Sequence, residues 1–377
     1  VLPSLRWVLR RHYLPDDEPT RFLMREYIVS AYQVAQDFTA LLDESDPQAV
    51  VVFNGMFFPE AVARRLAVGR GIRVITHEVS MLPYTAFFTA GEATTYPIHI
   101  PEDFELDAEQ NARLDKYLTE RFKGNFTMAG IRFWPEMRGL DEGFSQKAGQ
   151  FKQIVPVFTN VIFDTSQVHA NTLFPDMFAW LDAVLKVIRA HPDTLFVIRA
   201  HPDEMRPNKA SRDSVRGWVE RNHVTELPNV WFVDSGEALS SYDLINRSKF
   251  ILVYNSSIGL EASLMGTAVL CAGKARFTQY PTVFFPDTAV EFIHKLEDFL
   301  QVDKVEFSPD HQRQARRFLY YQLYKASLPF GAYLTEHSLP GFVKLRDFEL
   351  DQLLPEHSIT MQVILDGILK GKEFIMP

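Results

Sequence analysis

The second half of the chain alternates regularly between short apolar runs and amphipathic stretches. Apolar runs rich in β-branched residues predict buried parallel strands, and the stretches between them, with a period of about 3.6 residues, predict covering helices. The predicted strands are Ile154–Phe158, Leu195–Arg199, Val230–Val233, Phe250–Tyr254 and Ala268–Cys271. The predicted helices between them are Met177–Arg189, Ser211–Asn222, Ala238–Asn246 and a short helix before Ala268. This pattern indicates a parallel sheet covered on both faces.

The first half is less regular. After a helix predicted over residues 18–43, strand Ala49–Phe53, helix Pro59–Leu66 and strand Ile72–Ile75 predict a βαβ unit, with His77 and Glu78 following the second strand. Two strands before residue 150 are too few for a complete Rossmann-like domain, so we expect this domain to be incomplete in the sequence. Ser80–Ile100 is aromatic but has no clear period, and we interpret it either as a loop that contacts an acceptor or as a packed irregular segment.

Two further helices have clear boundaries in the sequence. Asp107–Phe122 is a charged helix, and a second helix has Ser308 as its N-cap, Pro309 at its first position and a run to Ala326. The polar stretch 139–150 contains three glycines and predicts a domain boundary.

Charge and composition exclude several classes of protein. The formal net charge is −9, which disfavours nucleic acid as the main ligand and a strong attachment to anionic lipid. The single cysteine, Cys271, lies in an apolar run and permits no intramolecular disulfide. The sequence has neither a membrane-spanning apolar run nor a signal peptide. We therefore expect a cytoplasmic protein with at most peripheral contact with the inner face of the membrane.

Polar residues follow the strand Phe250–Tyr254 directly. They are Asn255, Ser256, Ser257, Gly259 and Glu261. After a parallel strand, serine hydroxyls and helix N–H groups suit a phosphate, and a carboxylate one turn further on suits ribose hydroxyls. The alternative is ordinary helix capping, in which a serine and a glutamate close the first turn.

A second polar motif follows the strand that ends at Arg199. Pro202 ends that strand, which places His201 at the same sheet edge as Ser256. Lys274 and Arg276 follow the last strand and would add positive charge there, and Arg199 either contacts the ligand or pairs with the nearby carboxylates. The sequence has no Asp-x-Asp or recognisable zinc pattern, so we expect no metal.

The Arg-x-His-Pro motif, the Ser-Ser turn and the Gly-x-Glu-Ala motif, in this order, resemble those of the bacterial capsule polysaccharide biosynthesis glycosyltransferases, which include Kdo transferases. The resemblance covers roughly residues 150–330. It implies an α/β fold of the glycosyltransferase-B type, with two Rossmann-like domains facing across a cleft. The domains would comprise residues 1–149 for the acceptor and 150–305 for the nucleotide sugar, with C-terminal helices in 306–377 packing back on the first domain.

The same resemblance implies a function and its site. A sugar would pass from a nucleotide-activated donor to a growing surface polysaccharide of capsule or lipopolysaccharide type, with a glycan or glycolipid as acceptor, without metal or cofactor; a CMP-linked sugar is one candidate donor. The donor would contact Arg199, His201, Asn255, Ser256, Ser257, Gly259, Glu261, Lys274 and Arg276. A polyol-phosphate transferase of the teichoic-acid type, a nucleotide-sugar epimerase and a degenerate glycan-binding scaffold remain alternatives.

The sequence gives weaker evidence for the identity of the catalytic base. His77, Glu78 and Glu92 lie in the half where the acceptor should bind, and Asp164 follows the first strand of the other half. Any of the four could accept the proton of an acceptor hydroxyl, and in a retaining enzyme a carboxylate there could act as nucleophile or stabiliser.

Overall fold

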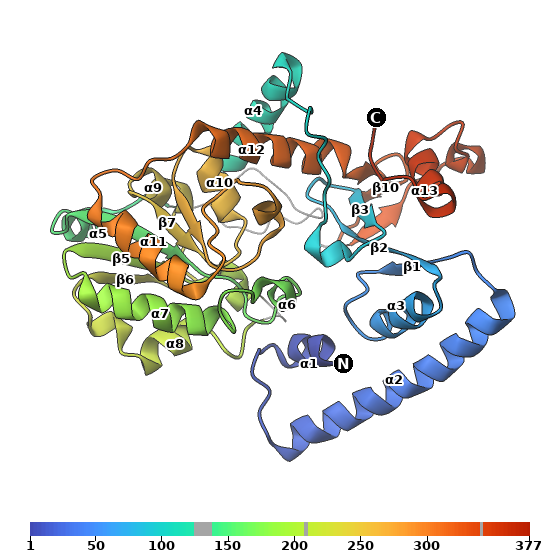
Figure 1. Ribbon diagram of the computed structural model, residues 1–377, viewed down its shortest axis with the longest axis horizontal. Helices are drawn as coiled ribbons and strands as arrows, with labels where there is room; N and C mark the ends of the chain where they lie inside the picture. The colour runs from blue at the N-terminus through green and yellow to red at the C-terminus, as the bar shows by residue number, and fades with distance from the viewer. Residues whose placement is uncertain (124–137, 207–209, 340–341) are drawn as a thin grey trace. The chain divides into compact units, whose positions relative to one another are not determined.

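The computed structural model of this chain describes residues 1–123, 138–206, 210–339 and 342–377 (Figure 1). It is a mixed α/β protein that divides into two compact units. Unit 1 comprises Val1–Leu5, Pro15–Phe133 and Arg317–Pro377, and unit 2 comprises Arg6–Leu14 and Trp134–Arg316. No helix in the described part of the chain is both long and apolar enough to cross a membrane.

Unit 2 is built on a sheet of five strands that all pair in parallel, as the alternating pattern predicts. The strands are β4 (Gln153–Phe158), β5 (Thr194–Arg199), β6 (Val230–Val233), β7 (Ile251–Val253) and β8 (Val269–Cys271), in the spatial order β6-β5-β4-β7-β8. The first strand, β4, is therefore central; β5 and β6 extend the sheet on one side of it, and β7 and β8 extend it on the other. In such a sheet the direction of winding reverses between β4 and β7, which is where α/β proteins bind ligands.

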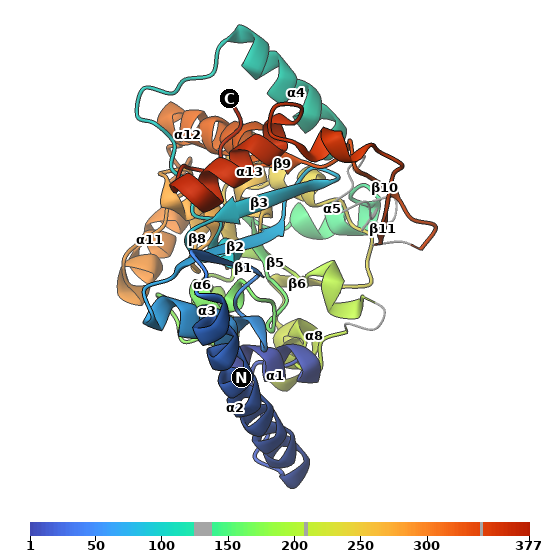
Figure 2. The same cartoon turned by 90° about the vertical axis from the view of Figure 1, so that its right-hand side faces the viewer.

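Helices cover both faces of this sheet (Figures 1 and 2). Side chains of α7 (Met177–Ala190), α8 (Val215–Arg221) and α11 (Ala289–Gln301) form one large core with Leu252, Leu270 and other residues of that face. On the opposite face, Gly259 of α10 (Ile258–Leu264) lies against Val253 and Val269, as expected when side chains alternate along a strand. The other helices of unit 2 are α5 (Glu142–Ala148), α6 (Gln167–Ala170), α9 (Ser241–Asn246) and most of α12 (Pro309–Tyr320).

Two helices of unit 2 begin later than predicted. The sequence predicts helices from Ser211 and from Ala238, whereas α8 begins at Val215 and α9 at Ser241. In each case the residue just before the helix is a serine whose hydroxyl accepts a backbone N–H of the first turn: Ser214 from Gly217 at 3.1 Å and Ser240 from Asp243 at 3.2 Å. Local capping therefore decides where these helices start.

Unit 1 contains a mixed sheet in the order β1-β2-β3-β9. Strands β1 (Ala49–Phe53) and β2 (Arg73–Val79) are parallel and joined through α3 (Glu60–Gly69), as predicted; α2 (Glu18–Ser45) packs on α3. Strands β3 (Thr85–Thr89) and β9 (Leu328–Pro329) are antiparallel to their neighbours.

The sequence-based interpretation of unit 1 was wrong in two respects. Ser80–Ile100 is not wholly irregular, because it contains β3 and the 3-10 turn Ala93–Thr95. His77 and Glu78 do not follow the second strand but lie within it, opposite Phe88 and Phe87 of β3. Pairing with β3 extends β2 by several residues. Such pairing does not change the spacing of apolar residues along the strand, so the sequence pattern does not reveal it.

The C-terminal region is more than a set of helices. After α12, a π-helical turn (Tyr321–Lys325) leads to β9, then to a hairpin of β10 (Leu334–Glu336) and β11 (Val343–Leu345), and to α13 (Ile359–Lys370). Within unit 1, Leu328 and Phe374 form a buried cluster with Ile75 of β2. The remaining helices are α1 (Leu2–Leu9) and α4 (Ala108–Phe122), the latter with Asp107 as the N-cap of a complete capping box.

The compact units and the predicted domains divide the chain at different places. Apart from Arg6–Leu14, unit 2 is the stretch Trp134–Arg316, whereas the sequence suggests residues 150 and 305. Within unit 2, the Arg138 N–H donates to the Ala238 carbonyl at 2.6 Å, and the Phe144 ring of α5 packs against Trp231. At the other end, the Gln312 side chain donates to the Leu264 carbonyl at 2.8 Å. These contacts hold α5 and most of α12 with unit 2.

Candidate nucleotide site

The polar residues predicted for a donor site gather at the carboxyl edge of the unit 2 sheet. His201 follows β5, Asn255–Ser257 follow β7, and Lys274 follows β8, while the loop after β4 carries Asp164. Strands β4 and β7 are neighbours, so the loops after them meet where the winding reverses.

Asn255 holds two of these loops together. Its side-chain oxygen accepts hydrogen bonds from the amides of Asn160 at 2.7 Å and Gln167 at 2.9 Å, and its amide donates to the Ser166 hydroxyl at 3.3 Å. Asn160 and Ser166 lie in the loop that follows β4, and Gln167 is the first residue of α6 after that loop. Asn255 is 8% exposed, and its hydrogen bonds brace the turn after β7 against the segment after β4.

Ser256 and Ser257 present hydroxyl groups that make no hydrogen bond to any described residue. Ser257 is the N-cap of α10 by position, but its side chain makes no capping hydrogen bond, and Leu260 occupies the third helical position where a capping box needs Glu or Gln. The simple capping alternative is therefore absent from this turn. Gly259 fits for a steric reason, because a Cβ atom there would lie 3.0 Å from Val253 and 3.1 Å from Phe277.

Glu261 is buried at 6% exposure, and its carboxylate accepts a hydrogen bond from the Tyr242 hydroxyl at 2.5 Å. Tyr242 lies in the first turn of α9, and the sequence analysis did not single it out. Only its place two residues after the Ser240 cap could have drawn attention to it. The structure thus adds a phenol that orients the carboxylate proposed to contact ribose.

The His201 imidazole is oriented by its own turn. Its Nδ1 accepts a hydrogen bond from the Asp203 N–H at 3.2 Å, so the neutral ring carries its proton on Nε2. Burial lowers the pKa of His201, an effect that Asp203 and Asp164 oppose. At neutral pH the ring is therefore an uncharged group whose Nε2–H can donate to an anionic oxygen.

Arg199 is the last residue of β5 and is almost completely buried. Its Nε donates to the Ser241 hydroxyl at 2.9 Å, and it does not pair with Asp203 or Glu204. Burial lowers the pKa of Arg199 to about 10, so the side chain stays positively charged at neutral pH. The guanidinium charge is buried at the end of β5 and does not reach into solvent.

Lys274 and Arg276 supply the other positive charges of this edge. The Lys274 N–H donates to the Ala170 carbonyl at 2.9 Å, which joins the loop after β8 to the end of α6. The Lys274 side chain is exposed and forms no ion pair with a described residue, and Arg276 is half-buried at the start of a 3-10 turn (Arg276–Gln279).

Asp164 is the predicted base that shares unit 2 with this site. Its carboxylate accepts the Ser166 N–H at 2.9 Å within the loop after β4, and its charge acts on His201. The other three candidates lie in unit 1.

In unit 1, the Glu78 carboxylate is bound by the Asn54 amide and by the Val79 N–H at 3.1 Å. His77 lies between Phe53 and Phe88, with ring centroids 5.4 Å and 5.0 Å away, and burial lowers its pKa. Each of these groups is engaged within the sheet itself.

Glu92, the third candidate in unit 1, precedes the 3-10 turn Ala93–Thr95. It accepts a hydrogen bond from Arg64 Nη1 at 2.9 Å, in an ion pair that is partly exposed. Arg64 belongs to α3, so this pair joins the helix to the segment after β3.

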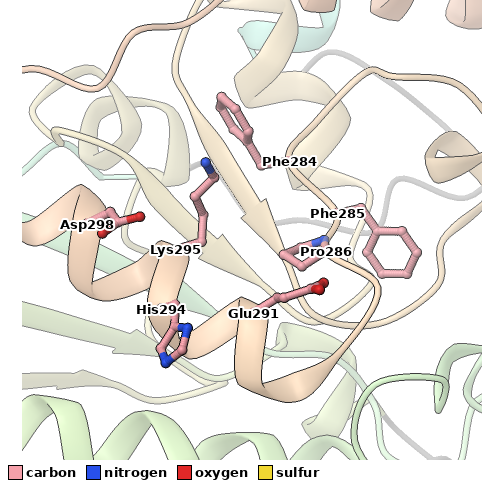
Figure 3. Close-up of a pocket in the computed structure, with 7 residues that line it drawn as sticks. All are labelled: Phe284, Phe285, Pro286, Glu291, His294, Lys295 and Asp298. Carbon is pink, nitrogen blue, oxygen red and sulfur yellow. The ribbon is translucent and has the colours of Figure 1, made fainter.

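Among the residues that the structure describes, no three His, Cys, Asp or Glu side chains gather as metal ligands would. A groove of about 360 Å³ lies elsewhere in unit 2, between the segment 284–286 and α11 (Figure 3). Lys295 reaches across it towards the ring of Phe284, 5.7 Å from the ring centroid. None of the predicted site residues lines this groove.

The solved structures that this chain is similar to are distant. They include the Thermosulfurimonas dismutans KpsC β-Kdo 2,4-transferase (11% identity, TM-score 0.47, 74% of this chain and 80% of that one) and its β-Kdo 2,7-transferase (14%, 0.44, 82% and 86%). A third is the UDP-GlcNAc 2-epimerase from Neisseria meningitidis bound to UDP-GlcNAc (15%, 0.32, 78% and 80%). At these scores the likeness says nothing about activity.

A search of curated proteins finds no match to this chain. A family model does match: residues 116–281 fit that of the capsule polysaccharide biosynthesis protein. The matched stretch covers less than half of the chain but contains every strand of the unit 2 sheet and the residues from His201 to Arg276. This stretch of the chain is therefore similar to the capsule polysaccharide biosynthesis protein family.

Proposed function

We propose that this chain is a glycosyltransferase that uses a nucleotide-activated sugar to extend a bacterial surface polysaccharide of the capsule or lipopolysaccharide type. The observation that carries the proposal is that His201, Ser256 and Ser257 follow strands β5 and β7 at the same edge of one parallel sheet, on either side of β4. The match to the family model supports it, because the matched stretch is the one that builds this edge.

The leaving-group phosphate would bind between His201 and the serine turn. His201 offers an Nε2–H, and Ser256 and Ser257 offer hydroxyls that have no hydrogen-bond partner among the described residues. Lys274 is an exposed cation that follows β8, the strand next to β7. Together with Arg276 and the buried charge of Arg199, these groups would stabilise the charge that grows on the phosphate as the sugar leaves. In this proposal the reaction needs no metal ion.

The nucleoside would extend from the phosphate towards α10. Glu261, oriented by Tyr242, would accept hydrogen bonds from the ribose hydroxyls, while Asn255 and Gly259 would shape the turn. Because Tyr242 already fixes the position of the Glu261 carboxylate, this side chain loses less conformational entropy when the nucleotide binds. Tyr242 should therefore contribute to nucleotide affinity as well.

The acceptor would be a glycan or glycolipid whose hydroxyl group loses a proton during transfer. Asp164 is the carboxylate of unit 2 proposed for this step, and Glu78, Glu92 and His77 are the proposed candidates from unit 1. Each would act by accepting the acceptor proton, or, in a retaining reaction, by stabilising the sugar cation.

The test is nucleotide binding followed by transfer. Calorimetry with CMP, CDP, UDP and GDP should identify one nucleotide class, and His201→Ala should weaken its binding by about 1.5–3 kcal/mol, the range for a hydrogen bond to a charged group. His294→Ala, at an exposed position of α11, is the matched control and should bind normally. Incubation with the corresponding nucleotide sugars and a polysaccharide acceptor then tests transfer. Unchanged affinity in His201→Ala, or no binding of any nucleotide, would contradict the proposal.

A further inference from the structure

Glu204 is a buried carboxyl group that joins three segments next to His201. It lies in the 3-10 turn Pro202–Met205 and is 2% exposed. Its N–H donates to the His201 carbonyl at 3.0 Å, and its own carbonyl accepts the Ser211 N–H at 2.8 Å. Both oxygens of its side chain accept the Val215 N–H, at 3.1 and 3.2 Å, where α8 begins. Glu204 therefore fastens the His201 turn to α8.

The surroundings of Glu204 disfavour a negative charge. No cation among the described residues pairs with it, and a single N–H serves two oxygens that could accept about four hydrogen bonds. Asp234, at the end of β6, is the charged group that faces it, and Asp234 is itself paired with Arg216. Burial, reinforced by Asp234 and partly opposed by the Val215 N–H, raises the pKa of Glu204 to about 8. At neutral pH the group is mostly protonated.

We propose that Glu204 is a positioning residue for the nucleotide site: in its uncharged form it clamps the His201 turn to α8, and loss of its proton opens the clamp. This inference rests on the proposed function, since it concerns how His201 is presented to a phosphate. An ionised carboxylate in this dry position, facing Asp234, gains hydration only by leaving α8. The Asp203 N–H that orients the His201 ring belongs to the same turn, so the ring would lose its orientation as well.

The experiment is a pH series of nucleotide affinity, by calorimetry with the nucleotide that binds best, on wild type, Glu204→Gln and Glu220→Gln. If only the protonated form is competent, the wild-type Kd should rise about tenfold between pH 7 and pH 9, because about one tenth of the molecules remain competent at pH 9. Glu204→Gln keeps the neutral form at every pH, so its Kd should change less than about twofold. Glu220→Gln, an exposed position on the same helix, should follow wild type.

A second measurement reads the group directly in the wild-type protein and needs no variant to fold. The ¹³C NMR signal of the Glu204 carboxyl, assigned by its absence in Glu204→Gln, should titrate near pH 8. Titration near pH 4 would overturn the inference, as would a wild-type Kd that stays constant up to pH 9 while His201→Ala still weakens binding. In those cases the proposed function survives. Absence of nucleotide binding at every pH would instead overturn the proposed function and this role together.

Discussion

The two sheets of this chain are completed in different ways. The strands of unit 2 come from one continuous stretch, 153–271, and all run parallel. Unit 1 takes β1, β2 and β3 from residues 49–89 but β9 from residues 328–329, and two of the three strand pairs in this sheet are antiparallel. The unit 1 sheet therefore depends for its stability on an edge strand from a distant part of the chain. The unit 2 sheet needs no strand from outside residues 153–271.

The same difference bears on where ligands bind. In unit 2 every strand ends at the same edge, so each loop after a strand adds polar groups to one place. In unit 1, His77 and Glu78 lie inside β2 and are engaged by their neighbours. The contrast favours unit 2 as the unit that holds the phosphate.

The largest expected effect tests the dependence of unit 1 on its C-terminal strand. Leu328→Ala removes a fully buried side chain that packs on Ile75 and Phe374, and should destabilise unit 1 by about 2–5 kcal/mol. Hydrogen exchange read by mass spectrometry should show lost protection in β1 and β2 but not in β4 and β5. Leu350→Ala, at an exposed position, is the control. Equal loss in both sheets would show that the units unfold together and would break the comparison.

A smaller effect is expected from the pair that holds Glu261 in unit 2. Tyr242→Phe deletes the hydroxyl that donates to the carboxylate and should weaken nucleotide binding by about 1 kcal/mol, roughly fivefold. Glu261→Ala should cost more with a ribonucleotide.

A 2′,3′-dideoxynucleotide provides the control for this pair. It should bind wild type and Glu261→Ala about equally, because coupling appears only between groups that interact. If the dideoxynucleotide is as sensitive to residue 261 as the ribonucleotide is, Glu261 supports the helix and not the ribose.

The smallest expected effect is on the pH dependence of stability, and it is tested on one histidine from each unit. Burial lowers the pKa of both His201 and His77, so the folded protein binds fewer protons than the unfolded chain. Their stabilising contribution is fully present above the ordinary histidine pKa of about 6.5 and is lost as pH falls below it towards the folded value. Melting temperatures between pH 7.5 and pH 5 should therefore fall less in His201→Gln and His77→Gln than in wild type. A steeper fall in either variant would show that the folded protein favours the charged ring there.

Local chemistry determined much of unit 2. Its strands are buried on both faces, so they are continuous apolar runs that a sequence displays directly, and the order of strands and helices follows from them. Pro202 and the Ser-Ser turn mark strand ends, and strand ends in a parallel sheet share an edge. His201 and Ser256 could therefore be assigned to one edge from the sequence, and the match to the family model falls on the same stretch.

Contacts between distant residues decided the rest. Strand β3 was not predicted, because its pairing with β2, and with a two-residue strand more than 230 positions away, leaves no periodic signal. Tyr242 meets Glu261 only once α9 and α10 pack on the same sheet, and Glu204 is hidden only once α8 begins at Val215. Whether a polar group is buried, and which group it bonds to, depends on the segments that pack over it. Residues next to it in the sequence do not determine those contacts.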